Sequence, residues 1–244
     1  MTVECRSRTF WLLALAVVAG VFYAATWFGW THDWRWLSRV DATALDAGWR
    51  IGVEHGAWVT FWHVLCSVFS PVTFRLLGIG LIVYEFTRRR RSSPSRSALP
   101  RKRGDPQHRC RVALFLIVTV ELSGVVTELA KRLADRPRPE TAMVDAASTS
   151  FPSGHALGSM VAVLALAVVL LPRLHRHLWP WAIAAGVLVV ISVGVGRVAL
   201  NVHHPSDVVA GWALGYLYFA ACLPLLGRPV MAADEIPAAP GSAR

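Results

Sequence analysis

Six stretches of the chain are predominantly apolar, and polar or charged segments lie between them. Their lengths approach the ~20 residues with which an α-helix crosses a bilayer. The predicted spans are residues 10–30, 72–86, 112–129, 156–171, 178–198 and 208–226. The pattern predicts an all-α fold, a polytopic membrane bundle of about six transmembrane helices, followed by a short polar tail at 227–244.

The residues between the first two spans, 31–71, are mixed in character and hold several tryptophans and acids. Tryptophan favours the membrane–water interface. The apolar run from Ala57 to Phe69 has 13 residues, fewer than the ~17 that a span needs. We therefore expect an extracytoplasmic connector that ends in a short interfacial helix. Residues 1–30 are expected to form an uncleaved transmembrane helix, and a cleaved signal peptide is the alternative.

The composition agrees with a membrane protein. Hydrophobic residues make up 55% of the 244 residues and charged residues only 16%, whereas soluble domains carry about 25% charged residues. The net charge of +10 could indicate nucleic-acid binding, but ten of the 25 lysines and arginines lie within residues 88–111. A short basic loop between two spans is typical of the cytoplasmic side. We therefore predict a multi-pass protein of the cell membrane, with membrane lipids as partners and no nucleic-acid ligand.

Counting spans outward from a cytoplasmic loop at 88–111 places the later loops. Residues 131–154 then lie outside, Arg173 and Arg176 lie inside, in agreement with the same rule, and residues 199–206 lie outside. The sequences KRLADRPRP, PSGH and GRVALNVHHPSD fall at these two outer loops. We therefore expect three polar segments of the core helices, 72–226, to meet on the extracytoplasmic face.

These three segments supply three cations, Lys131, Arg138 and Arg197. Arginine matches the oxygens of a phosphoryl group bidentately, and lysine adds a point charge. Ser153 and Gly154 precede a helix, where backbone N–H groups can bind an anion. The pattern predicts a phosphate-binding site made of these five residues.

Two histidines and one carboxylate complete the predicted site. A neutral imidazole can attack phosphorus, and a second one can donate a proton to the leaving oxygen and later accept one from water. Asp207 lies four residues after His203 and can hold its second ring nitrogen. We therefore predict His203 as the nucleophile, His155 as the acid–base group and Asp207 as the residue that orients His203.

Other charged residues near these segments are given lesser roles. Arg132 and Arg136 are interpreted as contacts to lipid headgroups or the surface, and His204 as a neighbour, because it lacks a carboxylate four residues on. Glu121 and Glu128 are seven apart within a span, so they share roughly one face. A structural polar contact is the leading interpretation for both, and Glu128 is the better candidate for function.

Acidic residues near the three segments are few. A divalent cation such as Ca²⁺ needs several oxygen ligands. The acids that lie nearby in sequence are Asp135, Glu140, Asp145 and Asp207. We therefore expect no metal and no other cofactor.

The three segments resemble the signature motifs of the type-2 phosphatidic acid phosphatase superfamily, KxxxxxxRP, PSGH and SRxxxxxHxxxD. The matching positions are Lys131, Arg138 and Pro139 in the first motif, Pro152 to His155 in the second, and Arg197, His203 and Asp207 in the third. The spacings agree fully over residues 131–207. Gly196 replaces the serine of the third motif, from which we expect weaker orientation of the phosphate-binding residues rather than inactivity.

The resemblance implies a metal-independent lipid phosphate phosphatase that forms a phosphohistidine intermediate. Substrates of similar bacterial proteins include undecaprenyl diphosphate, phosphatidylglycerophosphate and phosphatidic acid, and an outward-facing site favours undecaprenyl diphosphate. A phosphotransferase that uses the same intermediate is the alternative. A lipid-phosphate binder or transporter without catalysis agrees less well with the intact pair of histidines.

Overall fold

The computed structural model describes residues 3–87, 106–146 and 148–227, and these residues are helical or in loops. Six helical segments are long and apolar enough to cross a membrane: Thr9–Thr31, Gly56–Thr87, Pro106–Ala134, Gly154–Arg173, Arg176–Ala199 and Pro205–Leu226. The prediction of an all-α bundle with about six spans is therefore confirmed.

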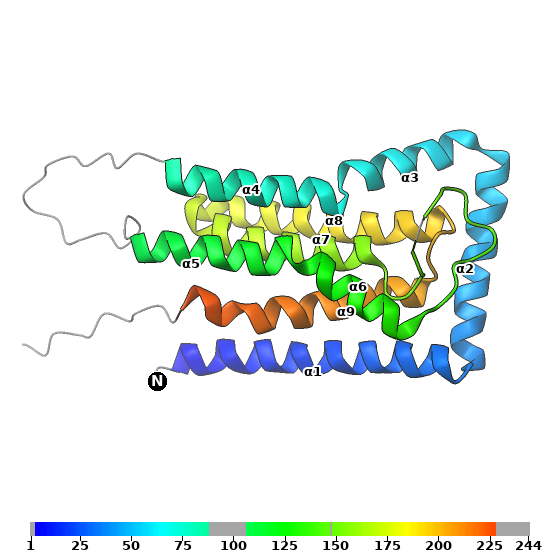
Figure 1. Cartoon of the computed structure of the whole chain (residues 1–244), viewed down its shortest axis with the longest axis horizontal. Helices are drawn as coiled ribbons and strands as arrows, with labels where there is room; N and C mark the ends of the chain where they lie inside the picture. The colour runs from blue at the N-terminus through cyan, green and yellow to red at the C-terminus, as the bar shows by residue number, and fades with distance from the viewer. Residues whose placement is uncertain (1–2, 88–105, 147, 228–244) are drawn as a thin grey trace, which may run out of the picture.

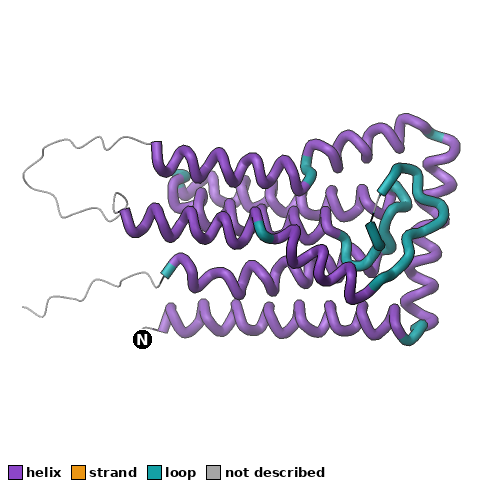
Figure 2. The backbone as a smooth tube through the Cα atoms, in the orientation of Figure 1, coloured by secondary structure: helices purple, strands orange, loops and turns teal. Residues whose placement is uncertain are grey.

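The long helices run side by side, and one helix lies across an end of the bundle (Figure 1). The bundle contains α1 (Val3–Thr31), α3 (Gly56–Val68), α4 (Pro71–Thr87), α5 (Pro106–Leu116), α6 (Ser123–Ala134), α7 (Gly154–Leu170), α8 (Trp179–Ala199) and α9 (Pro205–Cys222). The crossing helix is α2 (Arg35–Glu54). Loop residues gather at the end that α2 covers (Figure 2), so this end holds the irregular backbone.

The structure differs from the expected interfacial helix between Ala57 and Phe69. There α3 and α4 follow one another along the bundle as a single interrupted segment, Gly56–Thr87. The break at Phe69 and Ser70 allows two short helices to share the thickness that one long helix would cross. Instead, α2 lies across the end of the bundle, and its buried residues Leu37, Asp41, Gly48 and Gly52 form one stripe.

The third predicted span is interrupted as well. Residues Ile117–Glu121 form a short π-helix, η2, between α5 and α6. A π-helical turn holds one residue more than an α-helical turn and is frequent at functional sites. The interruption therefore turns the side chain of Glu121 about the helix axis relative to that of Glu128. An uninterrupted α-helix would have placed both side chains on one side.

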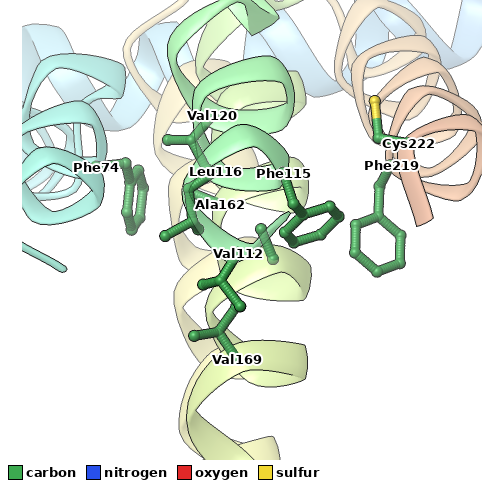
Figure 3. Close-up of a cluster of buried hydrophobic side chains, with 10 residues drawn as sticks. Phe74, Val112, Phe115, Leu116, Val120, Ala162, Val169, Phe219 and Cys222 are labelled. Atoms are coloured by element: carbon green, nitrogen blue, oxygen red, sulfur yellow. The ribbon is translucent and has the colours of Figure 1, made fainter. Parts of the chain in front are cut away.

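An apolar cluster fills the half of the bundle away from α2. Phe115 of α5 and Phe219 of α9 face each other there, and Phe74 of α4 packs into the same cluster from the other side of α5 and α7 (Figure 3). Large apolar side chains also cover the outside of the bundle, for example Trp181, 76% exposed, and Leu188, 65% exposed. Lipid tails are as apolar as these side chains, so this surface suits a membrane.

Helices α7 and α9 approach closely through glycine. A Cβ on Gly211 would lie 2.6 Å from the carbonyl oxygen of Ser153, and one on Gly215 would lie 2.9 Å from that of Leu157. Glycines four residues apart allow helix backbones to touch in membranes. This contact sets the spacing between the first turns of α7 and α9, which carry His155 and Asp207.

Replacing Gly211 by alanine is expected to force α7 and α9 apart, because the new methyl group meets backbone rather than a movable side chain. We expect the free energy of unfolding to fall by about 1–3 kcal/mol, measured by thermal unfolding in detergent. Gly80→Ala is the matched control, since a Cβ there meets nothing within 4 Å. Equal stability of the two variants would contradict this packing.

Candidate active site

A cavity of about 550 Å³ brings together six of the eight predicted site residues. They come from three separate parts of the chain: Lys131, Arg138, Gly154, His155, Arg197 and His203. The other two, Ser153 and Asp207, are fully buried behind the cavity wall. The expected meeting of three distant segments at one end of the bundle is therefore seen in the structure (Figures 1 and 2).

The cations of the cavity are held by backbone carbonyls. Lys131 is buried and its Nζ donates to the carbonyl oxygen of Thr149. Arg138 donates from Nε to the carbonyl of Ser148 and from Nη1 to that of Val202, both at 2.6 Å. Carbonyl contacts fix these side chains without neutralising them, so their charge stays available to an anion.

Arg197 is the most enclosed arginine of the cavity. It is only 7% exposed, and its Nε has no hydrogen-bond partner among the described residues. A buried donor without a partner is costly, and an anion in the cavity can supply the missing acceptor. Helix α8 carries this residue in its last turn, where the helix dipole favours a cation.

The tautomer of His203 follows from its contact with Arg138. Nε2 of the ring lies 3.2 Å from Arg138 Nη1. Because a guanidinium can only donate, Nε2 must accept, and the ring proton belongs on Nδ1. The lone pair of Nε2 is thus on the side of the cavity cations, as a nucleophile requires.

The other nitrogen of His203 faces Asp207. Nδ1 lies 3.6 Å from Oδ2 of the carboxylate, an electrostatic contact slightly longer than a hydrogen bond. Burial of the ring lowers the pKa of His203 to about 3, while the Asp207 carboxylate acts in the opposite direction. The imidazole is therefore neutral near pH 7.

Asp207 itself is held by several donors. Oδ1 accepts from Arg136 Nη1 at 2.6 Å, and Oδ2 accepts from Ser150 Oγ at 2.5 Å and from the backbone N–H of His204 at 2.8 Å. His204 Nδ1 lies 3.1 Å from the same oxygen. Pro205 opens α9, and the Asp207 carboxylate caps the first turn of this helix.

Arg136 joins Asp207 to α2. Its Nη2 donates to Asp41 Oδ2 at 2.9 Å, across 95 residues of sequence. Asp41 also accepts from the backbone N–H and the hydroxyl of Ser206, at 3.0 and 2.6 Å. The guanidinium lies 4.7 Å from the centre of the Trp30 ring, a cation–π distance. The crossing helix is thus connected directly to the predicted catalytic carboxylate.

One interpretation of a neighbouring charge is wrong. Arg136 is not a surface contact, because it is only 6% exposed and lies between two buried carboxylates. His204 lacks a carboxylate four residues on, but it contacts Asp207, three residues on, at the start of α9. The interpretation of Arg132 agrees with the structure, since it is exposed and pairs with Glu128.

The expected role of the Ser153 backbone also needs correction. Its N–H donates to the carbonyl oxygen of Asp207 at 2.9 Å, so it is not free to bind an anion. Gly154 begins α7 and lines the cavity. The bond from Ser153 instead joins the start of α7 to the start of α9, in the same region as the close contact at Gly211.

The place of the absent serine at Gly196 is filled by other side chains. A Cβ there would lie 2.7 Å from Cys66 Sγ and 2.9 Å from the Trp62 ring. Both residues belong to α3. A serine would therefore require the Cys66 and Trp62 side chains to shift, and the glycine allows these two side chains to pack against α8.

The structure offers no evident metal-binding cluster: among residues 3–87, 106–146 and 148–227, no three His, Cys, Asp or Glu side chains gather closely enough. A metal-free reaction stays a prediction. Of the two acids of the third span, Glu128 lines the cavity, whereas Glu121 lies beside Gly78 of α4.

A family model described as the PAP2 superfamily matches residues 112–230, which include all eight predicted site residues.

Residues 112–230 therefore form a region of the PAP2 superfamily.

Curated relatives are similar over the same part of the chain. Phosphatidylglycerophosphatase B of Bacillus subtilis (strain 168) is 36% identical over 110 residues, 43% of this chain and 54% of that protein. Lipid A 1-phosphatase of Rhizobium etli is 34% identical over 43% of this chain and 46% of that protein. Undecaprenyl-diphosphatase of Sulfolobus acidocaldarius is 33% identical over 43% of this chain and 50% of that protein. The matched region thus spans about half the length of these relatives.

A solved PAP2 structure has a similar fold. It is the crystal structure of a transmembrane PAP2 type phosphatidylglycerolphosphate phosphatase from Bacillus subtilis, with a TM-score of 0.63 and 22% identity. The similarity covers 86% of this chain and 93% of that one. It extends the PAP2 likeness beyond the region 112–230 at the level of the fold, and agrees with a multi-pass membrane protein.

Several residues that hold this PAP2 site were not predicted. Asp41, Ser150 and Ser206 all contact Asp207 or Arg136. For Asp41 a signal was present, since it is a carboxylate within the buried stripe of an amphipathic helix. Ser150 lies just before the second motif and Ser206 occupies a variable position of the third, so neither has a distinctive spacing.

Removing the charge of Arg136 is expected to destabilise the protein strongly. In Arg136→Met, the carboxylates of Asp41 and Asp207 would remain buried without their cation, a change that typically costs about 3–5 kcal/mol. The measurement is the free energy of unfolding in detergent micelles.

The control is Arg132→Met, which breaks an exposed pair with Glu128 and is expected to cost less than about 1 kcal/mol. If Arg136→Met were as stable as this control, the buried network would not hold the site together.

Proposed function

We propose that the chain is a metal-independent lipid phosphate phosphatase that works through a phosphohistidine on His203. The observation that carries this proposal is the orientation of His203: a neutral ring, Nδ1 toward Asp207 and Nε2 toward Arg138. This is the orientation that nucleophilic attack on phosphorus needs. The names of the relatives, which are phosphatases of lipids, agree with it.

The first step transfers the phosphoryl group to the protein. Nε2 of His203 forms a bond to phosphorus as the bond from phosphorus to the lipid oxygen breaks. His155 gives its proton to that oxygen, so a lipid alcohol, or a lipid phosphate from a diphosphate, leaves. Lys131, Arg138 and Arg197 stabilise the charge on the phosphoryl oxygens as it develops.

The second step releases phosphate. A water molecule attacks phosphorus, its proton goes to the now neutral His155, and the nitrogen–phosphorus bond breaks. Asp207 stabilises the positive charge that the His203 ring carries in the intermediate and keeps its tautomer afterwards. Both histidines return to their initial protonation states, so no further reactant is needed.

We further propose that the site faces the extracytoplasmic side. The cavity is lined by residues of the loops before α7 and after α8. These loops gather at the end of the bundle that α2 covers, whereas α4 ends and α5 begins at the opposite end (Figures 1 and 2). Arg109 and Arg111 of the basic segment belong to the start of α5. Cytoplasmic placement of such basic residues puts the cavity outside. From that side undecaprenyl diphosphate is the favoured substrate, with phosphatidylglycerophosphate and phosphatidic acid as other candidates.

The test is phosphate release by the purified protein from a panel of lipid phosphates, with and without EDTA. His203→Ala is expected to reduce kcat by at least about 10³-fold, the scale found for loss of a catalytic nucleophile. EDTA is expected to leave the wild-type rate unchanged. Thermal unfolding of each variant checks that the protein is folded.

Substantial turnover by a folded His203→Ala variant would refute His203 as the nucleophile. Loss of activity in EDTA that added metal restores would refute the metal-free reaction. Transfer of the label to an added alcohol in place of water would indicate the phosphotransferase.

A further inference from the structure

The cavity continues beyond the predicted phosphate-binding cations. Its lining also includes Ser70 at the break between α3 and α4, Arg75 in the second turn of α4, and Gly124 of α6. This second part lies farther from α2, because α4 begins midway along the bundle (Figure 1). It therefore lies on the side of the site from which a lipid tail would extend.

Arg75 is an unpaired cation in this part of the cavity. It lies inside the segment Gly56–Thr87, which is apolar enough to cross a membrane. Among the described residues it has no salt bridge within 4.0 Å, and its Nε is buried without a hydrogen-bond partner. A charged residue within a span is costly and marks a functional site by default.

Helix α6 makes room for this side chain. The place of a Cβ on Gly124 lies 2.0 Å from Arg75 Nη2, so any other residue there would displace the guanidinium. Glu121 attracts Arg75 electrostatically but does not approach to ion-pair distance. The arginine is therefore positioned against α6 without being neutralised by it.

Arg75 and Lys131 meet the same side of α6 at places two turns apart. Gly124, which touches the guanidinium, and Lys131 are seven residues apart, so their backbone positions differ by about 10 Å at ~1.5 Å per residue. Both side chains line the same cavity. Two linked phosphoryl groups can therefore be held by one cation at each end.

We propose that Arg75 binds the phosphoryl group that stays on the lipid when a lipid diphosphate is hydrolysed, and so selects diphosphates over monophosphates. The inference rests on the proposed phosphatase function. The terminal phosphoryl group lies among Lys131, Arg138 and Arg197, and the inner one reaches Arg75. The guanidinium fork matches two oxygens of that inner group. A monophosphate has no group at this place and gains nothing from Arg75.

The experiment compares two substrates with the same prenyl tail, one a diphosphate and one a monophosphate. Arg75→Gln is expected to lower kcat/KM for the diphosphate by about 10- to 100-fold, the range for loss of a hydrogen bond to a charged group. For the monophosphate kcat/KM is expected to change less than about twofold. Arg75→Lys should recover part of the diphosphate rate, since it keeps the charge but not the fork.

The matched control is Arg132→Gln, which removes an exposed arginine of α6 that does not line the cavity. It should leave the ratio of the two kcat/KM values unchanged. The monophosphate rate also reports folding, because a misfolded variant would lose both activities.

Two results would overturn the inference while leaving the proposed function intact. In the first, Arg75→Gln lowers kcat/KM equally for the diphosphate and the monophosphate, which would make Arg75 a structural partner of Glu121. In the second, it leaves both kcat/KM values unchanged. Absence of phosphate release from both lipids by the wild-type protein would instead refute the proposed function itself.

Discussion

The carboxylate of Asp207 is the constraint on which the rest of the site depends. It is fully buried, and a charge there is tolerable only with enough donors around it. Arg136, Ser150 and the start of α9 supply these donors. Because Arg136 also binds Asp41, the same requirement brings α2 across the end of the bundle. One buried charge thereby joins three distant parts of the chain.

The cavity beside this network has the opposite electrostatic character. Lys131, Arg138 and Arg197 line it, and none of them forms a salt bridge of 4.0 Å or less with another residue that the structure describes. Arg136, by contrast, is matched by two carboxylates. The described part of the protein therefore separates one neutralised arginine, which holds the structure, from several that remain available to a ligand. Such a cavity favours a multiply charged anion, and a phosphoryl group is one whose oxygens match these cations.

Close packing of α7 against α9 fixes the relative positions of the predicted catalytic groups. Gly211 lets α9 touch the backbone at the start of α7, and the N–H of Ser153 bonds across the same contact. His155 and Asp207 thus sit on adjoining first turns. Catalysis by oriented groups is sensitive to displacements of about 1 Å, so a rigid contact between the two helix starts serves the proposed chemistry directly.

Much of the architecture could be predicted from the sequence. The apolar runs predict the spans. The motifs between Lys131 and Asp207 are predicted to converge, because the number of spans between their loops places these loops on the same side of the membrane. The partner of Arg136 could not be predicted this way, since Asp41 is 95 residues away and spacing carries no information over that range. The span made of α3 and α4 was not predicted, because the minimum length required of a span assumes one unbroken helix. The occupied N–H of Ser153 depends on the α7–α9 contact, which no local pattern reveals.

The central claim is that Nε2 of His203 becomes bonded to phosphorus. The most direct measurement is to mix the protein with a ³²P-labelled lipid phosphate, quench in base within a single turnover, and map the label on the chain. The account predicts label on residue 203, attached to Nε2, because Nδ1 faces Asp207. Label on His155, or on Nδ1 of His203, would contradict it.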